Sequence, residues 1–590
     1  VDKPSSSQEA QDESVEEDDS LYEKLERLKS EIDNMKAKLS TMKKNKELSD
    51  MLRALEDLLQ NSNKKSSAKN VKRADFKEDL VDQVMKAISK KIKESTKKLG
   101  VSQGETEPND LLGQGKAPKP VQYPTLSLSQ YNDELNLVLK RFQASYDALN
   151  IHSKVCCLSL SLFPENVVIK KRHIIYWWIG EGFVKRTTEK KTAEEEVEDV
   201  FEELLNSNLI VPHGNGKSPL VNKFKIIPWI RHMLVQSVLG ESKQPFGIYS
   251  QIIAPSHHHD GHACLVLDQH KVKISGGFDL KFDHWRSVFN VSASYLNIEP
   301  QWMAKMKKLV VLQLGRWQES PSHHIEVDSA EFMKNLKAQK HLKYLSLRGI
   351  SRISELPASI AQLVSLQILD LKACHNLETL PNEIVLLRKL THLDVSECYL
   401  LESMPKGIEK LTELQVLKGF VVGNSSKTPR ISDLAKLKNL KRLSIHIGSE
   451  AVIQEGDFER LKELSAVKCL KISWGVLSNR GYKDVEIFLP IDLEKLDIEG
   501  FPSEKTPQWL KPINLPRGLK KLYITGGKLT SMGHEKKSSM YSMQIVRLKH
   551  LKNLQIDLKK LKEMFPSLKY AEGKGLVSSP SFEWSIEEGE

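Results

Sequence analysis

A six-residue frame recurs through the C-terminal half of the chain and constrains the fold more than any other feature. Each such repeat supplies a short parallel strand and a returning convex segment, and no repeat can bury its apolar edge alone. The sequence therefore predicts a leucine-rich-repeat solenoid, a parallel-strand horseshoe, over residues 301–575. The frame, L-x-x-L-x-L with Val or Ile substitutions, begins at Leu309, Leu342, Leu366, Leu390, Leu414, Leu440, Val467, Leu493, Leu519 and Leu551.

Two cysteines occupy a defined place in this repeat. Cys374 and Cys398 follow their strand frames at the position where leucine-rich repeats carry Asn or Cys. A small, weakly polar side chain can sit buried beneath the turn there. We therefore predict a structural role for both thiols.

Residues between the framework leucines are expected to point into the concave face, because alternate residues of a strand face opposite sides of a sheet. They combine charged, aromatic and imidazole side chains, which suits recognition of a protein surface better than enclosure of a small molecule. The predicted protein-binding residues are Tyr344, Arg348, Asp370, Lys372, His392, Asp394, Lys418, Phe420, Arg442, His446, Lys471, Lys495, Asp497, Lys521 and Tyr523.

The first 124 residues divide by composition into three segments. Residues 1–20 are acidic and almost free of apolar side chains, which predicts a disordered tail. Residues 21–99 are predicted to be a helical coiled-coil region, since apolar residues from Leu21 to Met42 alternate spacings of four and three. This region is compatible with a dimer or a helical hairpin. Its basic second helix is compatible with contact at a membrane surface or with the solvated face of a helical bundle. Residues 100–124, rich in Gly, Pro, Gln and Ser, are interpreted as a linker.

Residues 125–240 alternate helical patterns with short apolar runs. Helices are expected over 135–149, 169–178 and 193–206, then a hairpin over 211–221 and another helix from Pro228. Helices followed by a two-stranded wing predict a winged-helix domain. Residues 241–300 are assigned to a connector and N-terminal repeat cap, and 576–590 to a C-terminal tail. The expected fold class is multidomain α and α/β: a helical coiled coil, a winged-helix domain and a leucine-rich-repeat solenoid.

One segment of the predicted wing resembles a phosphate-binding loop in part. Gly214 to Ser218 ends like a P-loop, whose backbone amides cradle phosphates. However, Val211 stands where that motif requires glycine, and Pro212 removes an amide donor. We interpret the segment as the turn of the wing.

The candidate metal-binding and catalytic motifs do not have the residues that such sites require. The histidines from His257 to His262, with Asp260 and Cys264, are too close in sequence to converge on one tetrahedral metal, and no second ligand pair follows. They predict a flexible loop and no metal site. The sequence contains no recognised catalytic signature, so we expect no catalytic residues and no enzymatic activity.

Cysteine usage and charge restrict the compartment and the partners. Six cysteines without metal-finger spacing fit a reducing compartment, and neither a secretory signal nor a membrane-spanning apolar run is present. We expect a cytoplasmic protein that is not secreted, with peripheral contact at the plasma membrane as an option for the basic helix. The net charge of +11 is spread without a nucleic-acid module, so nucleic acid is not an expected partner.

Three phrases carry a family resemblance. They run from Ser145 to Leu149, from Cys157 to Glu165 and from Trp178 to Phe183, and read SYDAL, CLSLSLFPE and WIGEGF. In this order and spacing they resemble the winged-helix end of the nucleotide-binding module in plant coiled-coil NLR (nucleotide-binding leucine-rich-repeat) disease-resistance proteins. The resemblance extends over residues 125–570 and covers the coiled coil only loosely.

The resemblance also implies a departure from the family. Its members bind ADP or ATP through a P-loop and sense the nucleotide through a Met-His-Asp motif, whose place is held here by Ile226, Ile227 and Pro228. Two aliphatic side chains and a proline cannot coordinate a phosphate, and the segment 100–124 leaves no room for a P-loop domain. The resemblance thus implies a degenerate member with no cofactor and no nucleotide switch of its own.

These observations lead to one main hypothesis and two alternatives. The main hypothesis is an intracellular plant defence protein that recognises a pathogen effector or a guarded host protein through its repeats. Its helical N-terminus would signal, form homo- or hetero-oligomers, or pair with a full-length NLR. The alternatives are a leucine-rich-repeat adaptor for a host complex unrelated to immunity, and a nucleotide-hydrolysing switch whose P-loop lies upstream.

Overall fold

The computed structural model describes most of the chain from residue 142 onward. The described residues are 142–164, 167–184, 191–214, 220–228, 230–231, 233–234, 246–250, 262–267, 271–274, 285–317, 324–425, 427–475, 485–533, 542–576 and 581–586. All of them belong to one compact unit, Thr125–Glu590. The predicted acidic tail, coiled coil and linker lie outside the described residues, as does most of the histidine-rich segment.

The first described elements form a small helical domain with a three-stranded sheet. Its helices are α5 (Ile151–Ser159), α6 (Lys171–Glu181) and α7 (Ala193–Asn206). Strand β3 (Lys223–Lys225) pairs antiparallel with both β1 (Ile169–Lys170) and β2 (Val211–Pro212). The helices followed by the β2–β3 wing confirm the predicted winged-helix domain, and α7 has the expected bounds.

Local sequence signals fix the ends of α6 and α7. The Thr192 side chain accepts a hydrogen bond from the Glu195 amide at 3.3 Å, and the Thr192 amide donates to the Glu195 carboxylate at 2.8 Å. This capping box satisfies two amides at the start of α7, where acidic residues also suit the helix dipole. Helix α6 ends at Gly182, whose φ of 74° is the left-handed conformation that glycine adopts without strain.

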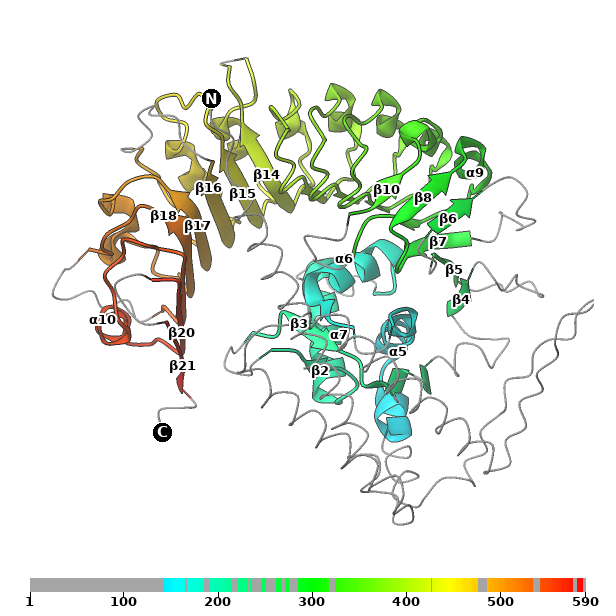
Figure 1. Ribbon diagram of the computed structural model, residues 1–590, viewed down its shortest axis with the longest axis horizontal. Coiled ribbons are helices and arrows are strands. Elements are labelled where there is room, and N and C mark those ends of the chain that lie inside the picture. The colour runs from blue at the N-terminus through cyan, green and yellow to red at the C-terminus, as the bar shows by residue number, and fades with distance from the viewer. Residues whose placement is uncertain are drawn as a thin grey trace, which may run out of the picture. The chain divides into compact units, whose positions relative to one another are not determined.

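The remaining elements build the repeat region around one long sheet (Figure 1). In the described part of the chain, fifteen strands form this sheet, and every pair in it is parallel except the last, β20 with β21. Three further strands form a separate parallel sheet, β6 (Lys271–Ile274), β8 (Tyr295–Ile298) and β10 (Glu326–Val327). The strands of the long sheet are β4 (Phe246–Ser250), β5 (His262–Leu267), β7 (Trp285–Asn290), β9 (Val311–Gln313), β11 (Tyr344–Ser346), β12 (Ile368–Asp370), β13 (His392–Asp394), β14 (Val416–Val422), β15 (Arg442–Ile447), β16 (Cys469–Trp474), β17 (Lys495–Phe501), β18 (Lys521–Gly527), β19 (Ile545–Lys549), β20 (Tyr570–Lys574) and β21 (Phe582–Ser585).

Short helices return the chain on the convex side. Most are 3₁₀ helices of three to six residues, which fit the short distance between successive strands. Figure 1 shows the strands following an arc, with these helices outside it and α6 on its inner side. The convex helices are α9 (Pro300–Lys305), Ala330–Ala338, Ala358–Gln362, Asn382–Leu386, Ile408–Lys410, Ile431–Lys436, Glu459–Glu463, Gln508–Leu510, Pro512–Asn514 and α10 (Leu558–Met564).

The framework leucines form one continuous core along the repeats. Leu345, Leu369 and Leu393 stand in register on neighbouring strands, and all three are fully buried. The thiols of Cys374 and Cys398 are buried beneath the turns and donate to the carbonyl oxygens of the preceding repeat at 3.1 Å. This confirms their predicted structural role.

The structure extends the predicted repeat region and corrects one repeat frame. The parallel sheet already begins at β4, inside the segment that we assigned to a connector and N-terminal repeat cap, because strands without framework leucines also pair in register. The frame at Leu551 is not a strand, whereas β19 follows Met543, which stands in the first apolar position instead of leucine. All six cysteines are free thiols.

Candidate protein-binding surface

The strand register arranges the concave side chains in rows that cross the sheet. The row that starts at Tyr344 contains Tyr344, Ile368, His392, Val416, Arg442, Cys469, Lys495, Lys521, Ile545 and Tyr570. The next row contains Ser346, Asp370, Asp394, Lys418, Ser444, Lys471, Asp497, Tyr523, Arg547 and Glu572. Most of the predicted binding residues therefore lie on the concave face as expected.

Helix α6 of the winged-helix domain packs directly on the first of these rows. The ring of Tyr176 meets the imidazole of His392 edge-on, with 4.7 Å between the centroids. Gly180 lies so close to Tyr344 that a Cβ there would come within 2.5 Å of the Tyr344 Cβ. The glycine in the WIGEGF phrase thus permits the close approach of helix and sheet.

A buried carboxylate secures the C-terminal end of α6. Glu181 accepts hydrogen bonds from Trp177 Nε1 at 2.8 Å and from the Ser287 hydroxyl, on β7, at 2.7 Å. Burial raises the pKa of Glu181 to about 7, although these two hydrogen bonds oppose the shift. The group is therefore poised to change its protonation near neutral pH.

A histidine near the start of α6 engages the repeats through both ring nitrogens. His173 Nδ1 donates to the carbonyl oxygen of Trp317 at 2.8 Å, and Nε2 accepts from Arg348 Nη1. Burial and the positive charge of Arg348 hold the pKa of His173 well below its usual range. The imidazole is therefore neutral, which lets it accept from the guanidinium.

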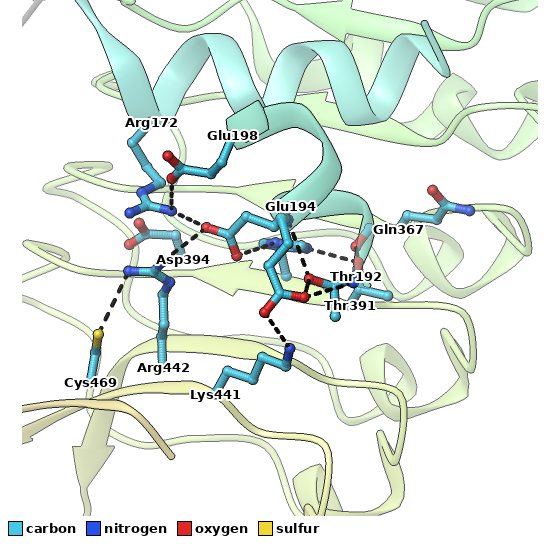
Figure 2. Close-up of polar contacts among 12 residues, drawn as sticks. Arg172, Thr192, Glu194, Glu198, Gln367, Thr391, Asp394, Lys441, Arg442 and Cys469 are labelled. Carbon is cyan, nitrogen blue, oxygen red and sulfur yellow. Dashed lines mark hydrogen bonds and ion pairs between the residues drawn. The ribbon is translucent and has the colours of Figure 1, made fainter. Parts of the chain in front are cut away.

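The first turn of α7 forms a third polar contact with the repeats, which Figure 2 shows in detail. Glu194 lies between Arg172 of α6 and Arg442 of β15, with 3.3 Å to Arg442 Nη2. Burial alone would raise the pKa of Glu194, but Arg442 and Arg172 lower it overall. Glu195 reaches Lys441 Nζ at 3.5 Å. The acidic residues that favour the start of α7 therefore also bind it to the repeats.

The winged-helix domain covers part of the concave face, which contradicts the prediction that the whole face is open. Tyr344, Arg348, Asp370, His392 and Asp394 lie on this face as predicted, but all are buried to 8% exposure or less. We expected them to be open to a partner. The physical reason is that the winged-helix domain occupies this part of the face, so these residues bind within the chain.

Residues at the margin of the covered part are half-buried and paired. Lys372 contacts Glu397 at 2.9 Å, and Lys418 contacts Asp394 at 3.1 Å. Burial alone would raise the pKa of Asp394, yet Lys418 keeps it below its usual range. His446 Nδ1 shares a hydrogen bond with the Ser473 hydroxyl at 3.0 Å. Their charges are thus largely satisfied inside the solenoid.

The predicted placement of Phe420 on the concave face is wrong. Gly419, with φ of 82°, shifts the register between β14 and β15, so that Phe420 pairs with Ile445. Phe420 is consequently fully buried in the core of the repeats. The available signal was Gly419 itself, which stands where the L-x-x-L-x-L frame requires its last apolar residue.

Beyond β15, none of the described winged-helix residues has a contact with the concave face. Lys471, Lys495, Asp497, Lys521 and Tyr523 are all partly exposed, as predicted. We name the partly exposed outward residues of β16–β20 the open concave face; its charged and aromatic members are Lys471, Lys495, Asp497, Glu499, Lys521, Tyr523, Arg547, Lys549, Glu572 and Lys574. The sequence did not predict Arg547 and its neighbours on this face, because Met543 takes the place of the first leucine in the frame of β19.

Ile226, Ile227 and Pro228, which we predicted to stand in place of the nucleotide-sensor motif, carry no side-chain group that could bind a phosphate. Ile226 is buried in the core that joins the winged-helix domain to the repeats, and Ile227 packs against that core. Pro228 is exposed at the start of a helical turn. Among the described residues, no cluster of His, Cys, Asp or Glu could hold a metal, and no helix could span a membrane.

A winged-helix domain packed onto the concave face of a leucine-rich-repeat solenoid defines the class of protein. Family models agree with both parts: residues 162–234 match the disease resistance protein winged helix domain, and residues 284–572 match the leucine-rich repeat region. The chain belongs with the plant disease-resistance proteins that combine these two domains.

Individual relatives support that assignment. The chain is 30% identical to Disease resistance RPP13-like protein 4 of Arabidopsis thaliana, over 74% of this chain and 50% of that protein. It is 27% identical to Disease resistance protein PIK6-NP of Oryza sativa subsp. japonica, over 42% of this chain and 22% of that one. The chain thus spans half or less of these relatives. A solved leucine-rich-repeat protein of Leptospira interrogans is also similar, with 21% identity, a TM-score of 0.37, and coverage of 54% of this chain and 80% of that one.

Proposed function

We propose that this chain is an intracellular defence protein that recognises a pathogen effector or a guarded host protein through the open concave face. Its N-terminal region signals or pairs with a full-length NLR. The proposal assigns no enzymatic activity and no nucleotide switch to the chain. The disease-resistance relatives and the two matched domains support the general role.

The extent of the winged-helix contacts along the sheet supports the proposed location of the recognition surface. The winged-helix contacts run from Ser287 on β7 to Arg442 on β15, while side chains on β16–β20 remain partly exposed. An intramolecular contact and a partner cannot occupy the same surface. Recognition therefore belongs to the open concave face, where Tyr523 supplies a large aromatic group of the kind enriched in binding hot spots.

The absence of a nucleotide switch is part of the proposal and has its own test. Ile226, Ile227 and Pro228 offer aliphatic groups where a sensor must meet a phosphate. Purified chain should therefore release no ADP or ATP on denaturation and should show no thermal shift with either nucleotide. Stoichiometric nucleotide in the purified protein would contradict this part.

The recognition function can be tested by capture from plant tissue with and without pathogen challenge. A variant that combines Lys471→Ala and Tyr523→Ala removes two partly exposed groups from the open concave face. The matched control is Tyr399→Ala, which removes a tyrosine that is 72% exposed in the turn after β13. We expect effectors, immune kinases or full-length NLRs with the unmodified chain and the control, and their loss with the double variant.

Two other outcomes have clear meanings. If the captured set is the same for all three proteins, the open concave face is not the recognition surface. If the double variant loses partners that have no connection to immunity, the chain is a leucine-rich-repeat adaptor for a host complex.

A further inference from the structure

The charges of the open concave face are unbalanced. Its six cations are Lys471, Lys495, Lys521, Arg547, Lys549 and Lys574, and its three carboxylates are Asp497, Glu499 and Glu572. The carboxylates already have partners on the same face. Asp497 contacts Lys495 at 3.1 Å and Glu499 contacts Lys471 at 2.5 Å, while Glu572 contacts both Lys549 at 2.7 Å and Arg547 at 3.4 Å. Positive charge is therefore left over at this surface.

The excess is most evident at Lys521. Within the part of the chain that the structure describes, Lys521 forms no ion pair, and its neighbour across the strands is another cation, Lys495. The side chain is half-buried, so water screens it less than an ordinary surface lysine. Burial lowers the pKa of Lys521, and the charges of Lys495 and Arg442 add to this shift, whereas Cys469 and Glu494 oppose it. An anion placed here would relieve that repulsion.

Aromatic rings hold several of these cations in place. Lys495 Nζ lies 4.2 Å from the centre of the Tyr523 ring, and the Arg547 guanidinium lies 5.1 Å from the same ring. Arg547 also lies 5.3 Å from the ring of Tyr570. Cations and rings thus alternate across β17–β20. Side chains fixed in this way lose less conformational entropy when a partner binds.

We propose that the open concave face binds an acidic segment of a partner protein, whose carboxylates meet Lys521, Lys495 and Arg547. This inference rests on the proposed function and specifies the chemistry of its partner. The interleaved carboxylates Asp497 and Glu572 favour a polypeptide over nucleic acid. Evenly spaced phosphates would meet these like charges, whereas a polypeptide can place backbone donors or basic residues opposite them.

The test compares short labelled peptides that bind the full chain. The acidic peptide carries alternating Asp and Glu; the neutral and basic peptides replace these with Gln and Lys, and an oligothymidylate of the same charge represents nucleic acid. Fluorescence anisotropy at low salt should show the acidic peptide binding about tenfold more tightly than the neutral one. The preference should shrink at high salt, because ions screen partly exposed charges.

Variants place the binding on this face. Lys521→Glu should weaken binding of the acidic peptide about tenfold, and the milder Lys521→Gln should weaken it about threefold without introducing a negative charge. The matched control is Lys528→Glu, an exposed lysine just after the same strand. It should change binding less than about twofold.

Covalent mapping gives an independent readout. Carbodiimide coupling joins peptide carboxylates to nearby lysine amines, and it should favour Lys521 and Lys495 over the exposed Lys528 and Lys552. Equal affinity for the neutral and acidic peptides would overturn the proposal. Coupling mainly at the exposed lysines, or an equal loss of peptide affinity with Lys528→Glu, would also overturn it. So would an oligothymidylate that binds more tightly than the acidic peptide and whose binding Lys521→Glu abolishes.

The outcomes separate this inference from the proposed function. If the peptides show no acidic preference while Lys471→Ala with Tyr523→Ala still loses immune partners, the chemistry is wrong and the recognition role stands. If the acidic preference holds but the captured partners are unrelated to immunity, the chemistry stands and the defence role fails.

Discussion

The ion pair between Glu194 and Arg442 offers a direct test of how the winged-helix domain is held on the repeats. Glu194→Gln removes the charge and keeps the shape of the side chain. At the observed 3.3 Å, the attraction is about 5 kcal/mol for an effective dielectric constant of about 20. Desolvation of both groups opposes it, and the Arg442 side chain keeps 30% of its exposure. We therefore expect a net coupling of about 1–3 kcal/mol.

A double-mutant cycle with Arg442→Met isolates that coupling from other effects of each substitution. The assay is amide hydrogen exchange of the full chain, followed over α7 and β15, because it reports local opening without requiring two-state unfolding. The matched control is Asp199→Asn on the same helix. Its partner Lys191 lies 2.5 Å away, but both side chains are more than half exposed. The control should leave the opening of α7 unchanged within experimental error, because water screens an exposed ion pair.

The result that refutes the reasoning is specific. A coupling between Glu194 and Arg442 within error of zero would show that this buried pair does not hold α7 on the repeats. Equal opening of α7 in Glu194→Gln and Asp199→Asn would show that exposure is not what separates the two pairs.

Further predictions concern pH, the backbone and the thiols. Burial raises the pKa of Glu181 from 4.5 to about 7. Between these pH values the folded state retains a proton that the unfolded state has lost, so the contribution of Glu181 to stability falls as pH rises from 4.5 to about 7. Burial lowers the pKa of His392 from 6.5 to about 4, so its contribution to stability rises with pH, but only below pH 6.5. Between pH 6.5 and about 8 the free energy of unfolding, measured by thermal denaturation, should therefore fall by about 1 kcal/mol. Glu181→Gln should abolish this fall. Gly419→Ala should cost about 1–3 kcal/mol in thermal denaturation because of its positive φ and the backbone 2.6 Å from a Cβ there, whereas Gly448→Ala, with open space, should cost less than about 1 kcal/mol. A thiol reagent should modify only Cys469 in the native chain, since the other five cysteines are buried, and rapid modification of Cys469→Ser would contradict this.

Periodic and capping signals in the sequence predicted the elements well. The spacing of leucines identifies the repeat strands from Val311 to Lys521, because each framework position must be apolar for the coils to stack. Thr192 and Glu195 mark the start of α7, since the cap is made within one turn of chain. Such signals are local, so one sequence is enough to read them.

Errors arose where one residue departed from the template. Met543 begins a repeat as well as leucine does, because its flexible side chain fills the same core position. Gly419 makes a bulge that turns Phe420 toward the core. A frame defined by residue type overlooks the first case, and a strict strand alternation overlooks the second.

The covered half of the concave face was beyond prediction for a different reason. Glu194 and Arg442 lie far apart in the chain, and each is typical of a solvated surface position when considered alone. No period or spacing links them. Only the packing of α6 and α7 shows that residues such as His392 are interior.

The winged-helix contacts also bear on how the repeats unfold. A solenoid usually opens one coil at a time, because each coil contacts only its neighbours. Here one domain spans seven consecutive strands, from β7 to β15. Separating any of these strands requires breaking contacts with a body that also holds the others, so they behave as one cooperative block. The described winged-helix residues do not brace the coils after β15, so these coils can fray singly from the C-terminal end, which gives the region proposed to meet a partner the greatest freedom to adjust to it.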